Sequence, residues 1–143
     1  MKIDGGCLCG LITYEADINP ERVAICHCTD CQINSGSAFR VVVPVGKDNF
    51  HLATGQLKTY VKTAASGAKR ALAFCPECGT HLYGTEPVNP QTFSLRLGTA
   101  RQAKELTPSV QIWRRSAFAW VSGIETKIKF DVQPPLPKIT GTQ

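Results

Sequence analysis

The sequence has no long apolar run. Its longest runs, such as Val41-Val42-Val43, are far too short to cross a bilayer, for which a helix needs about 20 apolar residues. Residues 1–4 also lack the apolar segment that is typical of a secretory signal. We therefore expect a cytoplasmic protein with no membrane partner.

Runs of basic residues and internal repeats are absent as well. The 143 residues carry a net charge of +5 with histidines neutral, but basic residues are adjacent only at 69–70 and 114–115. A net positive charge can favour an anionic partner, yet scattered charges indicate a soluble surface rather than a nucleic-acid interface. With 43% hydrophobic and 19% charged residues, the composition is that of a globular domain and argues against global disorder.

The sequence does contain many short segments with strand character. The clearest alternation lies at 92–98, where Phe93, Leu95 and Leu97 face one way. We expect a short helix that is capped by Thr29 or Asp30 and ends near Gly36, and a second short helix or loop at 100–106. The expected strands cover residues 11–17, 22–26, 37–45, 50–53, 56–63, 69–75, 79–83, 92–98 and 110–113.

These elements predict a mainly β fold with one or two short helices. We expect a single domain at residues 1–130. A proline-rich C-terminal tail at 131–143, with three prolines in residues 134–137, is expected to be poorly ordered.

All seven cysteines fall into three short groups, at 7–9, 26–31 and 75–78. Structural disulfides are rare in a reducing compartment, and seven is an odd number. Metal-binding thiolates are therefore the better interpretation of the cysteines.

The outer two groups together predict a closed metal site. Cys75-Pro-Glu-Cys78-Gly79 has the spacing of a zinc knuckle, and Cys7-Leu-Cys9 is a weaker second half. Four thiolates complete the tetrahedron of a structural zinc ion. The alternative is that one of the two pairs is simply buried free cysteine.

The central group is then one ligand short. Cys26, Cys28 and Cys31 offer three thiolates, and a fourth position open to water or substrate is typical of catalytic zinc. In an extended segment, the side chain of His27 would point away from its two cysteine neighbours, so we leave it out of the site. His51 and His81 stand in no motif, and we interpret them as ordinary surface or core residues.

The cysteine motifs resemble those of the glutathione-dependent formaldehyde-activating enzyme family, which includes centromere protein V. The resemblance rests on G-x-C-x-C-G at 5–10, C-H-C-x-x-C at 26–31 followed by Ser-Gly, and F-C-x-x-C-G-T at 74–80. It implies a β-tent of antiparallel sheets, like methionine sulfoxide reductase B. It also implies one structural zinc at Cys7, Cys9, Cys75 and Cys78 and one labile catalytic zinc at Cys26, Cys28 and Cys31.

The same resemblance implies the chemistry of S-(hydroxymethyl)glutathione synthase, a carbon–sulfur lyase. The thiol of glutathione would occupy the open zinc position and condense with formaldehyde or a related small electrophile. Gln32-Ile33 departs from the family pattern, because many relatives have a basic residue there. The candidates to meet the two carboxylates of glutathione, each interpreted as more typically a solvated arginine, are Arg40, Arg70, Arg96, Arg114 and Arg115.

Three other readings stay open at this point. One is a zinc enzyme that acts on another thiol or electrophile. Another is a zinc-stabilised binding module with nucleic acid as its partner. The third is a redox protein working through Cys28 and Cys31, although a thioredoxin-like βαβ pattern is missing. We interpret Trp113 and Trp120 as packing residues of the core or its rim rather than as ligand platforms.

Overall fold

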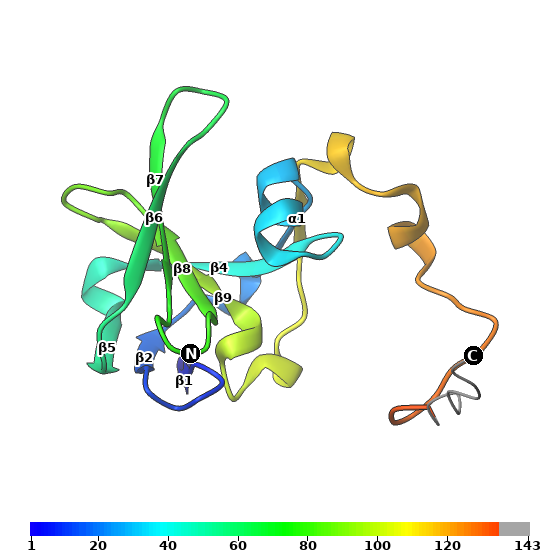
Figure 1. The fold of residues 1–143 in the computed structure, drawn as a ribbon, viewed down its shortest axis with the longest axis horizontal. Helices are drawn as coiled ribbons and strands as arrows, with labels where there is room; N and C mark the ends of the chain where they lie inside the picture. Colours follow the sequence, from blue (N-terminus) through cyan, green and yellow to red (C-terminus); the bar gives the residue numbers. More distant parts are fainter. Residues whose placement is uncertain (135–143) are drawn as a thin grey trace, which may run out of the picture.

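A computed structural model describes residues 1–134 of the chain (Figure 1). Of the predicted tail at 131–143, residues 135–143 lie outside the described part. The ten strands among the described residues are β1 (Lys2–Gly6), β2 (Thr13–Asp17), β3 (Ala24–Cys26), β4 (Arg40–Gly46), β5 (Phe50–Thr54), β6 (Lys58–Thr63), β7 (Lys69–Phe74), β8 (His81–Thr85), β9 (Thr92–Arg96) and β10 (Val110–Ile112).

Helical structure is sparse in the described residues. One α-helix, α1 (Thr29–Ser35), follows β3. Six 3-10 helices lie in the connections, at Pro20–Arg22, Lys47–Asn49, Leu97–Thr99, Ala103–Glu105, Arg114–Ser116 and Ala119–Gly123. None of the helices in this part of the chain is long and apolar enough to cross a membrane. The predicted mainly β class is therefore confirmed.

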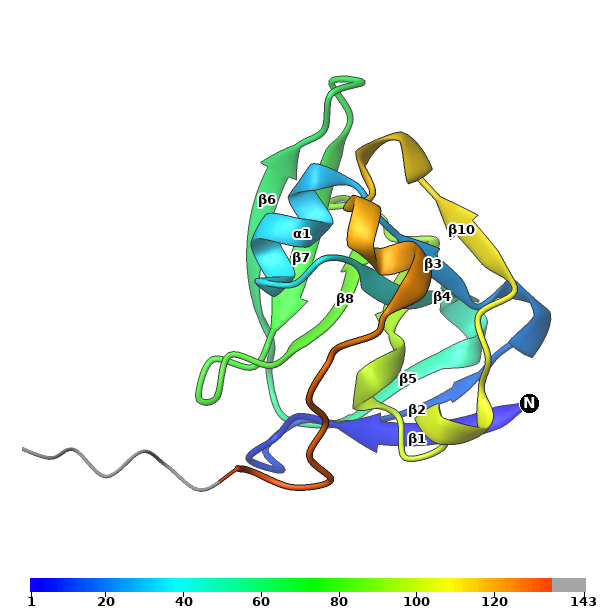
Figure 2. The same cartoon turned by 90° about the vertical axis from the view of Figure 1, so that its right-hand side faces the viewer.

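The strands form two sheets (Figure 2). A three-stranded sheet has the order β1-β2-β5, and a seven-stranded sheet has the order β10-β3-β4-β9-β8-β7-β6. Neighbouring strands are antiparallel except β10 and β3, which run parallel. The prediction of antiparallel sheets thus holds except at this edge. After β9 the chain crosses to the far side of β3, and β10 then pairs with β3 in the parallel direction.

The hydrophobic core lies between the two sheets. Ile3 and Tyr14 contribute from the small sheet, and Val43, Val45 and Leu95 from the large one. Alternate residues of a strand point to opposite faces of its sheet. The residues next to Val43, Val45 and Leu95 along β4 and β9 therefore point to the second face of the large sheet, away from this core. That second face is partly covered by α1 (Figure 2). Between α1 and this face lies the small cavity that Cys31 and Arg40 line.

Strand β1 was missed by the sequence analysis. Its pattern is weak because two of its five residues are glycines. The structure explains Gly5: a Cβ built there would lie 2.1 Å from the carbonyl oxygen of Thr99. Gly5 also forms an isolated bridge with Ala100, so β1 is held from both sides.

Candidate metal centres

The first cysteine group joins two loops that are distant in the sequence. Cys7 and Cys9 lie in the connection from β1 to β2, and Cys75 and Cys78 lie in the turn between β7 and β8. Their four sulfur atoms lie within 4.8 Å of one another. The structure therefore brings together the four residues that the sequence grouped.

The spacing of these sulfurs fits a tetrahedral ion. With zinc–sulfur bonds of about 2.3 Å, the sulfurs of a tetrahedral centre are about 3.8 Å apart. The Sγ atoms of Cys7 and Cys9 are 3.5 Å apart, and those of Cys9 and Cys75 are 3.8 Å apart. The group could hold a metal ion with little rearrangement.

The backbone around this group is arranged to turn N–H groups and sulfurs inward. The turn after Cys75 closes with hydrogen bonds from the Gly79 N–H to the Cys75 carbonyl (2.9 Å) and from the Cys75 N–H to the Thr80 carbonyl (2.9 Å). Gly79 has φ of +73°, which favours glycine. On the other loop, the Ile12 N–H donates to the Cys7 sulfur at 3.2 Å.

Thr80 connects the two loops and was not singled out as a site residue from the sequence. Its Oγ1 accepts a hydrogen bond from the Leu8 N–H (3.1 Å) and lies 3.2 Å from the Cys78 sulfur, to which the hydroxyl can donate. The Thr80 hydroxyl, together with the N–H groups of Thr80 and Cys9, lowers the pKa of Cys78 to about 5. A thiolate, the form that binds metals, is thereby favoured at this position.

The second cysteine group lies where β3 passes into α1. Cys26 is the last residue of β3, Cys28 is the N-cap of α1, and Cys31 lies in the first turn. Their sulfurs lie within 4.8 Å of one another, and no other Cys, His, Asp or Glu among residues 1–134 belongs to this group. The group therefore has three ligand atoms.

The helix begins one residue earlier than expected. Thr29 and Asp30 were the predicted caps, but the Cys28 sulfur accepts from the Cys31 N–H at 3.3 Å and fills the capping role. A sulfur can satisfy a free N–H of the first turn in the same way as the usual oxygen cap. The end of the helix is as predicted, with Gly36 in the left-handed region at φ of 63°.

Two thiols of this group, those of Cys26 and Cys31, shift each other's pKa in opposite directions. A hydrogen bond from Cys31 lowers the pKa of Cys26, in spite of the opposing effect of burial, and the same bond raises the pKa of Cys31. In the metal-free group Cys26 therefore loses its proton before Cys31 does, and the Cys31 thiol donates a hydrogen bond to the Cys26 thiolate.

The side chain of His27 points away from the second group. Its Nε2 lies 2.9 Å from Oε1 of Gln111, its ring packs edge-on against Phe39, and the residue is only 1% exposed. His81 is half-buried and packs near Phe74, and His51 is exposed on β5. None of the three histidines belongs to either cysteine group.

Two of the five candidate arginines differ from their predicted setting, whereas Arg114 and Arg115 are exposed as interpreted and Arg70 is half-buried. Arg40 and Arg96 are 7% and 9% exposed, so they are not solvated as interpreted, because they lie on the face of the large sheet that α1 covers. Trp113 and Trp120 are 49% and 61% exposed and are therefore not core residues. Arg115 stacks over the Trp113 ring at 4.9 Å.

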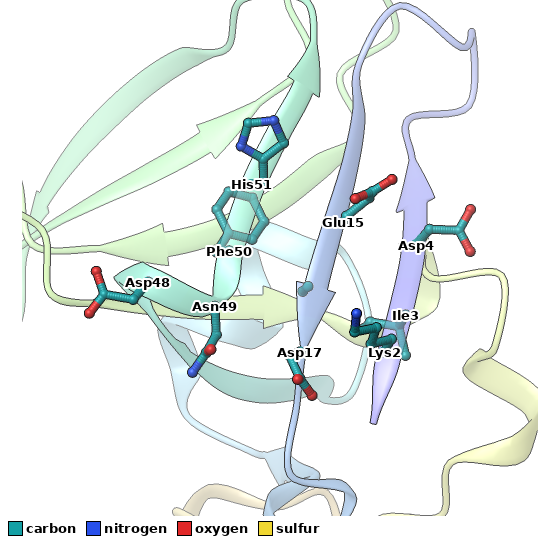
Figure 3. Close-up of a pocket in the computed structure, with 10 residues that line it drawn as sticks. Lys2, Ile3, Asp4, Glu15, Asp17, Asp48, Asn49, Phe50 and His51 are labelled. Atoms are coloured by element: carbon teal, nitrogen blue, oxygen red, sulfur yellow. The ribbon is translucent and has the colours of Figure 1, made fainter.

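A hollow of about 480 Å³ lies over the small sheet, and no cysteine lines it (Figure 3). Two of its carboxylates are already paired. Asp17 meets the amino terminus at 2.9 Å, and Asp4 pairs with Arg101 and accepts from Gln102. This hollow is separate from the cysteine chemistry.

Comparison with known proteins places this arrangement in context. A provisionally named glutathione-dependent formaldehyde-activating enzyme of Aspergillus flavus is 34% identical over 80 residues, which are 54% of this chain and 41% of that protein. An uncharacterized lyase of Schizosaccharomyces pombe is 31% identical over 82 residues, covering 57% of this chain and 56% of the relative. The chain thus spans about half the length of these curated relatives.

A solved structure shares the fold. The crystal structure of a Rhodobacter sphaeroides protein matches with a TM-score of 0.59 at 16% identity, covering 76% of this chain and 98% of that one. Residues 2–116 match the model of one protein family, described as glutathione-dependent formaldehyde-activating enzyme. This match takes in both cysteine groups, and the chain therefore belongs to the glutathione-dependent formaldehyde-activating enzyme family.

Proposed function

We propose that this protein is a zinc-dependent carbon–sulfur lyase that joins the thiol of glutathione to formaldehyde or a related small electrophile. The observation that carries the proposal is the difference between the two cysteine groups. One has four sulfurs and is complete, whereas the other has three and leaves a position for a substrate. Family membership and the names of the relatives support glutathione and formaldehyde as the substrates.

The four-cysteine group has a structural role in this proposal. Cys7 and Cys9 would share one ion with Cys75 and Cys78 and so tie the β1–β2 loop to the β7–β8 turn. Structural zinc contributes about 10–16 kcal/mol of apparent binding free energy in small zinc peptides. That is comparable with the whole stability of a typical domain, about 5–15 kcal/mol.

The three-cysteine group has the catalytic role. Cys26, Cys28 and Cys31 would hold the second zinc, which when bound lowers the pKa of an incoming thiol. In the overall reaction a carbon–sulfur bond forms, the carbonyl electron pair moves to oxygen, and the proton of the thiol ends on that oxygen. The product is a hydroxymethyl thioether.

The residues around the three cysteines favour negative charge there. The Cys31 N–H already donates to the Cys28 sulfur, and the charges of Cys31 and Cys26 oppose the lowering of the Arg96 pKa by burial and by Arg40. An incoming thiolate adds one more negative charge to the site. Nearby buried cations can offset that charge, because Coulomb interactions are strong where water is excluded.

The proposal is tested by titrating the zinc-loaded protein with glutathione in a calorimeter and following hydroxymethyl product formation from ¹³C-formaldehyde by NMR. We expect binding at millimolar concentration or below and product formation faster than the uncatalysed rate. Cys31→Ser should abolish both, while His51→Gln, an exposed change on β5, should preserve both. Wild-type protein with two zinc ions and no glutathione binding at millimolar concentration would contradict the proposal.

A further inference from the structure

Two arginines share a face of the large sheet with the second cysteine group. Cys26 lies opposite Arg40 in the β3–β4 pair, and Val42 lies opposite Arg96 in the β4–β9 pair. Residues directly opposite each other, and residues two apart on one strand, project from the same face. Cys26, Arg40 and Arg96 therefore point to the same side, the side on which α1 lies.

These side chains border a small cavity between α1 and the sheet. Its volume is about 130 Å³, enough for about four water-sized groups at roughly 30 Å³ each. Asp30, Cys31 and Asn34 line it from α1, with the Asp30 carboxylate paired to Lys62, and Arg40, Arg70 and Arg96 line it from the sheet. A metal-ligand candidate and three guanidinium groups thus open onto the same space.

The two buried arginines of this cavity have no carboxylate partner. Within residues 1–134, neither Arg40 nor Arg96 forms an ion pair, whereas Lys62 and Arg70 at the outer side pair with Asp30 (2.7 Å) and Glu86 (3.3 Å). Isolated buried charge is costly, and buried cations are normally paired. Apart from the neighbouring cysteine group, these two positive side chains therefore have no anionic partner among the described residues.

The hydrogen bonds of these arginines leave donors free. Arg40 Nη2 donates to Oδ1 of Asn34 at 2.5 Å, and Arg96 Nη1 donates to the Ser94 carbonyl at 3.2 Å. The Nε of Arg96 is buried and has no partner. A guanidinium has five N–H groups arranged to meet a carboxylate with two parallel hydrogen bonds.

Gly84 on β8 provides space for the Arg96 head group. A Cβ built on Gly84 would lie 3.2 Å from Nη2 of Arg96 and 3.3 Å from Cδ2 of Leu72. This is tighter than usual van der Waals contact, so the absence of a side chain lets the guanidinium lie over the strand beside the cavity.

We propose that this cavity binds a carboxylate of the thiol substrate, held by Arg40 and Arg96, while the thiol reaches the position beside Cys26, Cys28 and Cys31. The inference rests on the proposed function and narrows its substrate class to thiols that carry a carboxylate. Because Cys31 lines the same cavity, even a short carbon chain can join such a carboxylate to the thiol.

Arg96 is charged at neutral pH in this account. Burial and the neighbouring Arg40 lower the pKa of Arg96 to about 10, which still leaves it protonated at pH 7. A rival role is that the arginines only balance the charge of the cysteine thiolates. The two roles differ in one respect, because charge balance would serve every thiol equally, with or without a carboxylate.

The test compares two thiols that differ only in the carboxylate, 3-mercaptopropionate and 3-mercaptopropionamide, by calorimetric titration of the full zinc-loaded chain. We expect wild type to bind the carboxylate thiol about tenfold or more tightly than the amide, as the loss of a charged hydrogen-bond partner usually costs at least that. Arg96→Gln and Arg40→Gln should remove this preference, because they weaken binding of the carboxylate thiol much more than binding of the amide. Arg101→Gln, at an exposed arginine paired with Asp4, is the matched control.

Equal affinity of wild type for the two thiols would overturn the inference, and so would an equal loss of both in Arg96→Gln. The wild-type comparison decides even if a buried variant fails to fold. Propionate, which has no thiol, separates this inference from the proposed function. If propionate binds but glutathione and the amide do not, the carboxylate site in the cavity is supported and the proposed function is contradicted. If neither propionate nor 3-mercaptopropionate binds, the carboxylate site is contradicted.

Discussion

Cys26 and Arg40 lie directly opposite each other in the antiparallel pair β3–β4, so their side chains project from the same face of the sheet. Arg40 is buried there, and its guanidinium also contacts Asn34 of α1. The second cysteine group thus has a buried arginine beside it. The register of one strand pair accounts for this juxtaposition.

The two cysteine groups should differ in what they contribute to stability. Cys75→Ser removes one of four ligands from the group that ties two loops together, and we expect a fall in the midpoint of thermal unfolding together with loss of the tightly held zinc. Cys31→Ser should release the other zinc and leave the midpoint close to that of wild type. Thermal unfolding of both variants, paired with metal analysis, makes the comparison. Equal destabilisation by the two changes would contradict the assignment.

Gly5 should not tolerate a side chain. Gly5→Ala places a methyl group 2.1 Å from the Thr99 carbonyl oxygen, so β1 or the 97–99 turn must shift. We expect a loss of about 1–3 kcal/mol in the free energy of unfolding, the range for overpacked buried sites. Gly98→Ala is the control, because no atom lies within 4 Å of a Cβ at that position. Denaturant unfolding measures both, and a loss as small as that of the control would show that β1 can move freely.

Thr80 should slow the release of zinc from the four-cysteine group. Thr80→Val keeps the shape and removes the hydroxyl that contacts the Cys78 sulfur and accepts from the Leu8 N–H. Loss of a hydrogen-bonding group behind a metal ligand typically costs about 10–100-fold in metal affinity. Thr80→Ser retains the hydroxyl and should behave like wild type. The release rate in excess chelator is the measurement, and identical rates in all three proteins would remove Thr80 from the site.

The stability of the protein should fall on mild acidification because of His81. Burial, together with Arg40 and Arg96, lowers the pKa of His81 from its ordinary value of 6.5. The unfolded chain therefore takes up this proton at a higher pH than the folded chain does, and stability present above pH 6.5 is progressively lost as the pH falls below it. The free energy of unfolding of wild type and His81→Gln, measured from pH 8 to about 5.5, should differ in slope in this window. Parallel curves would contradict the prediction.

Much of the site could be predicted from spacing alone. The C-x-x-C knuckle at 75–78 and the division of seven cysteines into four and three depend on local sequence and on the ligand number of zinc. Placing His27 outside the second group needed only the alternation of an extended segment, and its contact with Gln111 fits that argument. The zinc ions themselves, the catalytic role and the β-tent likeness stay predictions.

Other features depend on tertiary contacts that local patterns do not encode. Strand β1 contains two glycines, and the reason for Gly5 is a carbonyl oxygen 94 residues further on, at Thr99. Arg40 and Arg96 were interpreted as solvated because that is the usual setting of an arginine. Here α1 partly covers that face, and only the folded chain reveals that both arginines are buried.

The measurement that tests the central claim most directly is the zinc content of the purified protein before and after brief treatment with a chelator. The account predicts two zinc ions per chain, with one removed by the chelator and one retained, and it predicts that glutathione binding disappears with the first. A single tightly held ion in protein reconstituted with excess zinc, with Cys26, Cys28 and Cys31 all reactive toward a thiol reagent, would contradict it.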